Sequence, residues 1–136
     1  MVAKVGDRAR CLCGSGQMLR DCCGRFLLRE RQPATAEQLM RSRYCAYVQA
    51  NSIYLRDSWH PSTRPAELML DQLPVPQWLG LKIVRTSGGG AYDAQGEVEF
   101  VARYKLGGKA FRLHEISRFV KEQGCWYYVA GEILSH

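Results

Sequence analysis

The chain has 136 residues, of which 46% are hydrophobic and 24% are charged, and its formal net charge is +6. This composition is close to the average of globular proteins and excludes a chain that is disordered throughout. No run of 18 apolar residues occurs, which excludes a transmembrane helix. No stretch of signal-peptide character precedes Cys11, so we expect a cytoplasmic protein without membrane insertion.

The uneven composition predicts a small amino-terminal module followed by one larger domain. Residues 1–31 hold seven Lys or Arg, three acidic residues and four of the six cysteines, whereas residues 32–136 are more balanced in charge. We therefore place the boundary near Pro33, with a module over 1–31 and a domain over 32–136. A chain of this length buries one sizeable core and not two.

Two helices are expected at the start of the larger domain. Thr35 is followed three residues later by Gln38, a capping-box pattern, and apolar residues then recur at helical spacing. This pattern predicts one helix over residues 35–57. Pro65 suits a first helical position, which predicts a second, short helix over residues 65–73.

The rest of the chain is predicted to form strands, over residues 78–86, 92–106, 109–121 and 125–133. Between the second and the third strand stands a Gly-Gly pair at residues 107–108, which fits a two-residue hairpin turn. Helices followed by a meander of long strands predict an α+β fold with a four-stranded antiparallel sheet packed on the helices. Long strands twist, so the sheet should curl and enclose a concavity.

Four cysteines within thirteen residues predict a metal site in the module: Cys11, Cys13, Cys22 and Cys23. Zinc is bound by four thiolates at tetrahedral corners. Disulfides are disfavoured in a reducing compartment, and a redox-active pair usually has two residues between its cysteines, which is absent here. We therefore predict one structural zinc ion in a closed site.

The surroundings of these thiols carry further expectations. Arg10, Arg20 and Arg25 lie near the cysteines in sequence, and their positive charge would lower the cost of gathering thiolates. The other two cysteines, Cys45 in the first predicted helix and Cys125 in the last predicted strand, are interpreted as ordinary small apolar residues.

The cysteine segment also carries a resemblance. Residues 10–25 contain Cys-x-Cys-Gly-Ser-Gly and, after eight residues between the inner cysteines, Cys-Cys-Gly-Arg. This pattern resembles the SEC-C motif, a zinc-binding segment that forms the tail of the secretion ATPase SecA and docks onto partners there. The resemblance implies that the four cysteines of the segment are the zinc ligands.

The larger domain carries a second resemblance. It contains Met-Arg-Ser-Arg-Tyr-Cys-Ala-Tyr over residues 40–47, Trp-His-Pro over 59–61, His-Glu-Ile-Ser-Arg-Phe over 114–119 and Trp-Tyr-Tyr over 126–128. Together with the SEC-C segment, these stretches resemble the bacterial YchJ family, which joins that motif to a domain similar to nuclear transport factor 2. The resemblance implies a cone-shaped α+β domain whose curled sheet encloses a pocket. It implies no reaction, because that fold hosts enzymes and binding modules alike.

A regular hairpin turn fixes which residues of the second and third strands face each other. It pairs Phe100 with Glu115 and Val98 with Ser117 on one largely apolar face. Glu115 is interpreted either as a pocket carboxylate, acting as a general base or orienting a ligand, or as the salt-bridge partner of an arginine on the first helix. A bulge in the strand would instead turn it outward.

Other pocket candidates come from the helices and from the histidines. Tyr44 and Trp59 are placed to line the pocket from the helix side, although aromatic residues at helical spacing are also typical of a core. His60 and His114 are the histidines best placed for proton transfer, although each is also typical of a surface position. The predicted pocket set is therefore Glu115, Ser117, Tyr44, Trp59, His60 and His114.

Three functions are compatible with these features. The leading hypothesis is a non-enzymatic interaction or adaptor protein, in which the zinc module docks a protein partner and the pocket receives a ligand. The alternative is a small-molecule enzyme that uses the pocket around Glu115. Binding of nucleic acid or ribosomes through the arginines of the module is the third, and it is less favoured because only Phe26 offers a ring for base stacking there.

Overall fold

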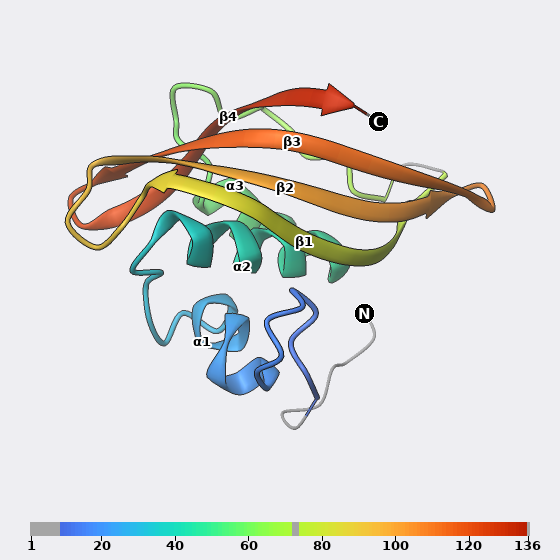
Figure 1. Ribbon diagram of the computed structural model, residues 1–136, viewed down its shortest axis with the longest axis horizontal. Coiled ribbons are helices and arrows are strands. Elements are labelled where there is room, and N and C mark those ends of the chain that lie inside the picture. The colour runs from blue at the N-terminus through green and yellow to red at the C-terminus, as the bar shows by residue number, and fades with distance from the viewer. Residues whose placement is uncertain (1–8, 72–73, 136) are drawn as a thin grey trace.

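The computed structural model describes residues 9–71 and 74–135. Its four strands form one antiparallel sheet in the order β1-β2-β3-β4, curled over the helices, which confirms the predicted α+β fold (Figure 1). Within the described residues, no helix has the length and apolar character needed to cross a bilayer. The elements in chain order are the 3-10 turn η1 (Leu19–Asp21), the helices α1 (Cys23–Leu27), α2 (Ala36–Val48) and α3 (Ser52–Asp57), and the strands β1 (Gln77–Gly88), β2 (Gln95–Leu106), β3 (Lys109–Glu122) and β4 (Cys125–Ser135).

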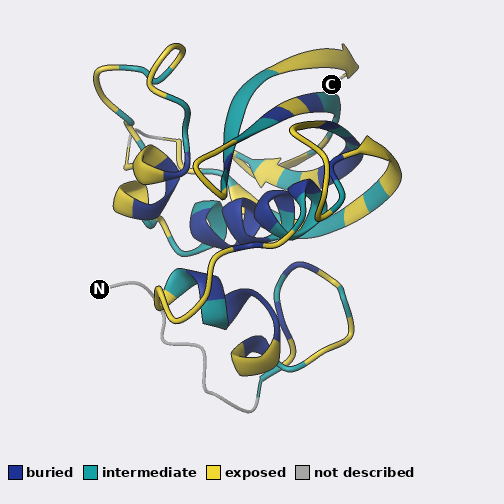
Figure 2. Cartoon of the chain, turned by 90° about the vertical axis from the view of Figure 1, so that its left-hand side faces the viewer, coloured by how far each residue is buried: buried dark blue, intermediate teal, exposed yellow. Residues whose placement is uncertain are grey.

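Helix α2 lies between the sheet and the amino-terminal segment, as Figures 1 and 2 show from two sides. One side of α2 contributes Leu39 and Tyr44 to the main core, where they pack with Phe100 and Phe119 of the sheet. Another side contributes Cys45, which is fully buried among the cysteines of the amino-terminal segment. Both apolar clusters therefore depend on the same helix, because each must cover its buried surface with another element.

The predicted register between β2 and β3 is confirmed. Phe100 pairs with Glu115 and Val98 with Ser117, and the turn glycines at 107 and 108 have φ values of 59° and 80°. The predicted start of β2 at residue 92 is wrong, because β2 begins at Gln95. Residues 90–93 instead form a turn in which the Gly90 N–H donates to Asp93 Oδ2 at 2.9 Å.

The single helix predicted over residues 35–57 is in fact two helices. Helix α2 ends at Val48, Ala50 takes a φ of 53°, and α3 begins after Asn51. The Asn51 side chain accepts the N–H of Tyr54 at 3.1 Å, which is the N-cap interaction that starts a new helix. A local capping residue therefore overrides the apolar periodicity that continues across the break.

The short helix predicted over residues 65–73 is also wrong. Residues 65–71 contain no helix, and residues 72–73 lie outside the described part of the chain. None of residues 65–71 is fully buried, and Met69 is 56% exposed. A helix of this length needs tertiary packing to be stable, so a proline at its first position does not suffice.

Candidate functional site

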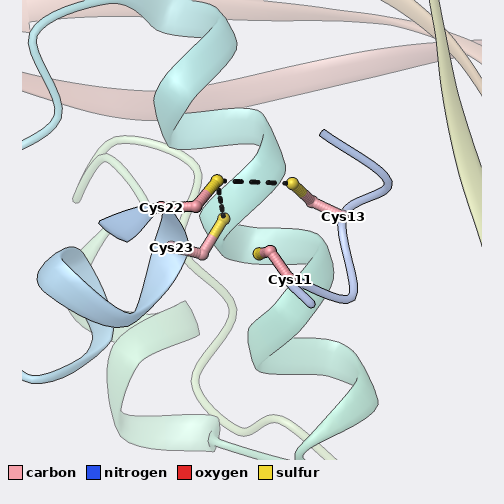
Figure 3. A group of neighbouring side chains, drawn as sticks. All are labelled: Cys11, Cys13, Cys22 and Cys23. Atoms are coloured by element: carbon pink, nitrogen blue, oxygen red, sulfur yellow. Dashed lines mark hydrogen bonds between the residues drawn. The ribbon is translucent and has the colours of Figure 1, made fainter. Parts of the chain in front are cut away.

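The four predicted ligands converge at one point beside α2 (Figure 3). Cys11 and Cys13 come from the loop before η1, Cys22 lies between η1 and α1, and Cys23 is the first residue of α1. Their four sulfur atoms lie within 4.8 Å of one another. The Sγ of Cys22 is 3.7 Å from that of Cys13 and 3.9 Å from that of Cys23.

This spacing fits a tetrahedrally coordinated metal ion. A metal–sulfur distance of about 2.3 Å places the corners of a tetrahedron about 3.8 Å apart, close to the separations observed. The four side chains are between 0% and 6% exposed. The site is therefore closed: four thiols can hold an ion, and no position is left open for a substrate.

A short closed loop brings the first two cysteines into place. The Cys11 N–H donates to the Gln17 carbonyl at 2.8 Å, and a bridge pairs Arg10 with Met18. Gly14 lies within this loop at a φ of 81°, which side chains with a Cβ rarely adopt. The 3-10 turn η1 follows this loop and leads to the second pair of cysteines.

Two residues of α2 complete the surroundings of the thiols, and sequence reasoning missed both. Cys45 is not an isolated apolar residue, because its Sγ lies 3.6 Å from that of Cys11. Arg41 donates from Nη1 to the Cys13 carbonyl at 3.0 Å and to the Cys13 Sγ at 3.6 Å. Arg41 and Cys45 are four residues apart, so they lie on the same side of a helix. This spacing was the sign in the sequence that both could contact the same cluster.

The electrostatic support of the cluster thus differs from the expectation. Arg10 donates to the Gly16 carbonyl, Arg25 donates to the Cys22 carbonyl, and Arg20 is exposed, so none of the three donates to a sulfur atom. Hydrogen bonds from neighbouring thiols lower the pKa of the Cys13 thiol, against the effect of burial. Arg41 therefore contacts a thiol whose pKa lies below its ordinary value.

A cavity of about 240 Å³ lies between α2 and the inner face of the sheet. Three of the six predicted pocket residues line it: Glu115, Ser117 and Tyr44. The Ser117 hydroxyl donates to Glu115 Oε2 at 2.7 Å. No ion pair joins Glu115 to an arginine among the described residues, and no bulge between β2 and β3 turns it outward.

The absence of a side chain on Gly131 makes room for this carboxylate. A Cβ at that position would collide with the Glu115 carboxyl group. Strand β4 therefore allows Glu115 to lie along the inner face of the sheet, beside its partner Ser117.

The other three candidates lie outside the cavity lining. Trp59 packs edge-on against Tyr128, with ring centroids 4.9 Å apart. His60 Nε2 lies 3.0 Å from Glu122. His114 pairs with Val101 on the opposite face of the sheet from Glu115, because strand residues alternate between faces, and its Nε2 lies 2.6 Å from Glu99.

Arg43 is a cavity residue that sequence reasoning missed. It projects from α2, is 3% exposed, and donates from Nη1 to the Leu55 carbonyl at 2.8 Å and to Ser58 Oγ at 2.7 Å. Sequence reasoning considered an arginine of the first helix only as a salt-bridge partner of Glu115 and did not single out Arg43, although Arg43 stands three residues after Met40 and four before Tyr47, at helical spacing.

A second, larger cleft of about 400 Å³ runs along α1, α3 and the turn between β3 and β4. Charged side chains lie along it, and Arg29 there already pairs with Asp57 at 2.8 Å, half exposed to solvent. The smaller cavity is the better candidate for a ligand, because ligand sites are mostly apolar with a few placed polar groups.

Comparison with known proteins identifies the larger domain. The family model described as the YchJ middle domain, similar to nuclear transport factor 2, matches residues 35–131. The chain belongs to this family. A UPF0225 protein of Chromobacterium violaceum is 53% identical over 133 residues, covering 96% of this chain and 98% of the relative. Another, from Streptomyces coelicolor, is 48% identical and covers 91% and 95% of the two chains.

Solved structures add the amino-terminal segment to the comparison. The solution structure of a SEC-C motif-containing protein from Rhodopseudomonas palustris matches with a TM-score of 0.80 and 36% identity, covering 92% of this chain and 98% of that one. A crystal structure of a SEC-C motif-containing protein from Psychrobacter arcticus has a TM-score of 0.69 at 23% identity and supports the fold. The YchJ-type domain and the cysteine segment thus occur together in a protein of similar structure.

Proposed function

We propose that the protein is a non-enzymatic binding protein in which one structural zinc ion, held by Cys11, Cys13, Cys22 and Cys23, fixes a ligand-binding domain. Four thiolates in a closed tetrahedral arrangement are the donor set of structural zinc sites. The SEC-C motif named for the structurally similar proteins supports the same metal.

The observation that carries this proposal is the double role of α2. Arg41 and Cys45 contact the thiol cluster, whereas Met40, Arg43 and Tyr44 line the cavity. A metal that organises the cysteine segment therefore also fixes a helix that shapes the cavity. The segment is too short for a large core of its own, so metal binding supplies much of its folding free energy.

A binding role suits the cavity better than catalysis. Among the described residues, no histidine or cysteine lines it, and the one carboxylate is already hydrogen bonded to Ser117. If the protein were an enzyme, Glu115 would be the general acid or base. Its possible proton-transfer partners among the described lining residues would then be tyrosine and serine hydroxyls.

Two measurements test the proposal. Metal analysis of protein purified without chelator is expected to show one zinc per chain, and less than half an equivalent would contradict the metal assignment. Native mass spectrometry of the freshly purified chain is expected to show a small co-purifying molecule. Substrate turnover that depends on Glu115 would replace the binding role with the enzyme alternative.

We further propose that the outward surface of the zinc module docks a protein partner in the cytoplasm. The cluster thiols are buried, and among the described residues of the module Arg20 and Leu28 are exposed, Leu28 at 67%. All six cysteines are free, which suits a reducing compartment. Four thiolates and one divalent ion lower the formal charge from +6 to +4, which weakens the case for nucleic acid.

Pull-downs with the full chain test this docking surface. Arg20→Glu is expected to lose a partner that the unaltered chain captures, and Arg85→Glu on the sheet serves as the control for charge alone. Identical partners for all three chains would contradict the docking role. Captured material that disappears on nuclease treatment would assign the surface to nucleic acid instead.

A further inference from the structure

The cavity contains two charged side chains that form no ion pair. Arg43 enters from α2, and Glu115 enters from β3. Among the described residues, no carboxylate oxygen lies within 4.0 Å of the Arg43 guanidinium, and no cationic nitrogen lies within 4.0 Å of the Glu115 carboxylate. Arg43 is buried and Glu115 is half-buried. A charge that is removed from water without a counterion is costly, so each group offers an interaction to a ligand of opposite charge, the stronger one at Arg43.

The protein holds Arg43 firmly without neutralising it. The guanidinium carbon lies 5.0 Å from the ring centroid of Trp59 and 4.5 Å from that of Tyr128, and the Tyr47 hydroxyl also favours the charged form. Burial lowers the pKa of Arg43, but an arginine stays protonated in proteins. The aromatic rings and the hydrogen bonds to α3 thus fix a positive charge in the wall of the cavity.

The rest of the lining is mostly apolar. Glu115 has one hydrogen bond, from Ser117, so its carboxylate retains acceptor positions for a ligand. The volume of about 240 Å³ corresponds to roughly eight water molecules at about 30 Å³ each, or to a molecule of about a dozen non-hydrogen atoms. The apolar contacts come from Met40, Trp78, Phe100, Ala102 and Leu113.

We propose, on the basis of the proposed ligand-binding function, that this cavity binds a small zwitterion with an apolar body, such as a hydrophobic amino acid. Its carboxylate contacts the Arg43 guanidinium, and its ammonium group contacts the Glu115 carboxylate. A neutral apolar molecule would leave both protein charges unpaired. A simple anion or a simple cation would satisfy only one of them.

Four probes that share a phenyl ring test this assignment on the full, zinc-loaded chain. L-phenylalanine carries both charges, 3-phenylpropionate only the carboxylate, phenethylamine only the ammonium group, and toluene neither. Isothermal titration calorimetry is expected to show L-phenylalanine binding at least about tenfold more tightly than each of the others. Each charge-assisted hydrogen bond is worth on the order of tenfold or more in affinity.

Variants separate the two charges. In Arg43→Met the advantage of L-phenylalanine over phenethylamine should disappear, and in Glu115→Gln its advantage over 3-phenylpropionate should disappear. Because the Arg43 substitution also removes hydrogen bonds to α3, Ala102→Leu provides a second variant that fills the cavity and should weaken every probe. Glu122→Gln, outside the cavity, is the matched control and should change none of them.

The outcomes distinguish this inference from the function on which it rests. Toluene binding as tightly as L-phenylalanine would overturn the zwitterion and leave a ligand-binding cavity intact. If no probe binds, the zwitterion is again overturned, while native mass spectrometry decides independently whether the cavity holds any ligand. Equal affinities in the Arg43→Met and Glu115→Gln variants and in the unaltered chain would show that neither charge contacts the probe.

Discussion

Replacing Arg41 tests whether α2 stabilises the thiolates of the metal centre. Its Nη1 lies 3.6 Å from the Cys13 Sγ, and the side chain is 21% exposed. At an effective dielectric constant of about 20, two unit charges at that separation attract by roughly 4–5 kcal/mol. A bound metal neutralises part of the thiolate charge and solvent screens the guanidinium, so the net effect is smaller. Removing a group that contacts a metal ligand typically lowers metal affinity by about 10- to 100-fold, which corresponds to about 1.4–2.8 kcal/mol of binding free energy.

We therefore expect Arg41→Ala to lower zinc affinity by about 10- to 100-fold, measured by competition with a chromogenic chelator. Arg41→Lys should recover part of the loss, because it keeps the charge but not the two separate nitrogens that reach Cys13 and Glu37 at once. Glu37→Gln tests the other partner of Arg41, because the Nε of Arg41 donates to the Glu37 carboxylate at 2.9 Å. Arg85→Ala is the control, because it removes an arginine on the sheet that contacts Glu99 and not the thiol cluster. An affinity of Arg41→Ala within about twofold of the unaltered chain would refute the reasoning, as would an equal loss in Arg85→Ala.

Four further predictions follow from the same contacts. Removing zinc with a chelator should lower the melting temperature measured by circular dichroism, and restoring zinc should recover it; an unchanged melting temperature would contradict a structural ion. Cys45→Ala should keep one zinc per chain by metal analysis, since four other thiols remain, and a ratio below one half would make Cys45 a ligand. Ser42→Ala should lower the free energy of unfolding, measured with urea, by about 1–3 kcal/mol, because the buried Tyr54 hydroxyl loses its partner at 2.6 Å. Tyr54→Phe should then cost less in the Ser42→Ala chain than in the unaltered chain. Gly131→Ala should push the flexible Glu115 carboxyl group aside and break its hydrogen bond with Ser117, at a cost of about 0.5–1.5 kcal/mol. In a chain that also carries Glu115→Ala the same substitution should cost less, and equal losses in both chains would refute the collision.

Local signals predicted most of the architecture. The Gly-Gly turn at residues 107–108 set the pairing of β2 with β3, and period-2 alternation then placed Glu115 and Ser117 on the inner face. The errors occur where short-range signals compete. Asn51 caps a new helix although the apolar pattern continues, and Pro65 opens no helix although Leu68 and Leu70 pack partly buried against α3, because none of residues 65–71 is fully buried.

Sequence alone determined the four cysteines that converge, the order of the strands and the register of β2 with β3, because these depend on spacing along the chain and on backbone periodicity. The register shifts between β1 and β2 and between β3 and β4 were not predicted. Only the tertiary structure decided what α2 contributes. Cys45 and Arg41 contact the four-thiol cluster, and Arg43 lines the cavity, because helix packing sets which side of α2 meets which partner. The tertiary structure likewise decided where two of the positive charges lie: Arg41 contacts a buried thiol, and Arg43 lines the cavity with no carboxylate within 4.0 Å among the described residues.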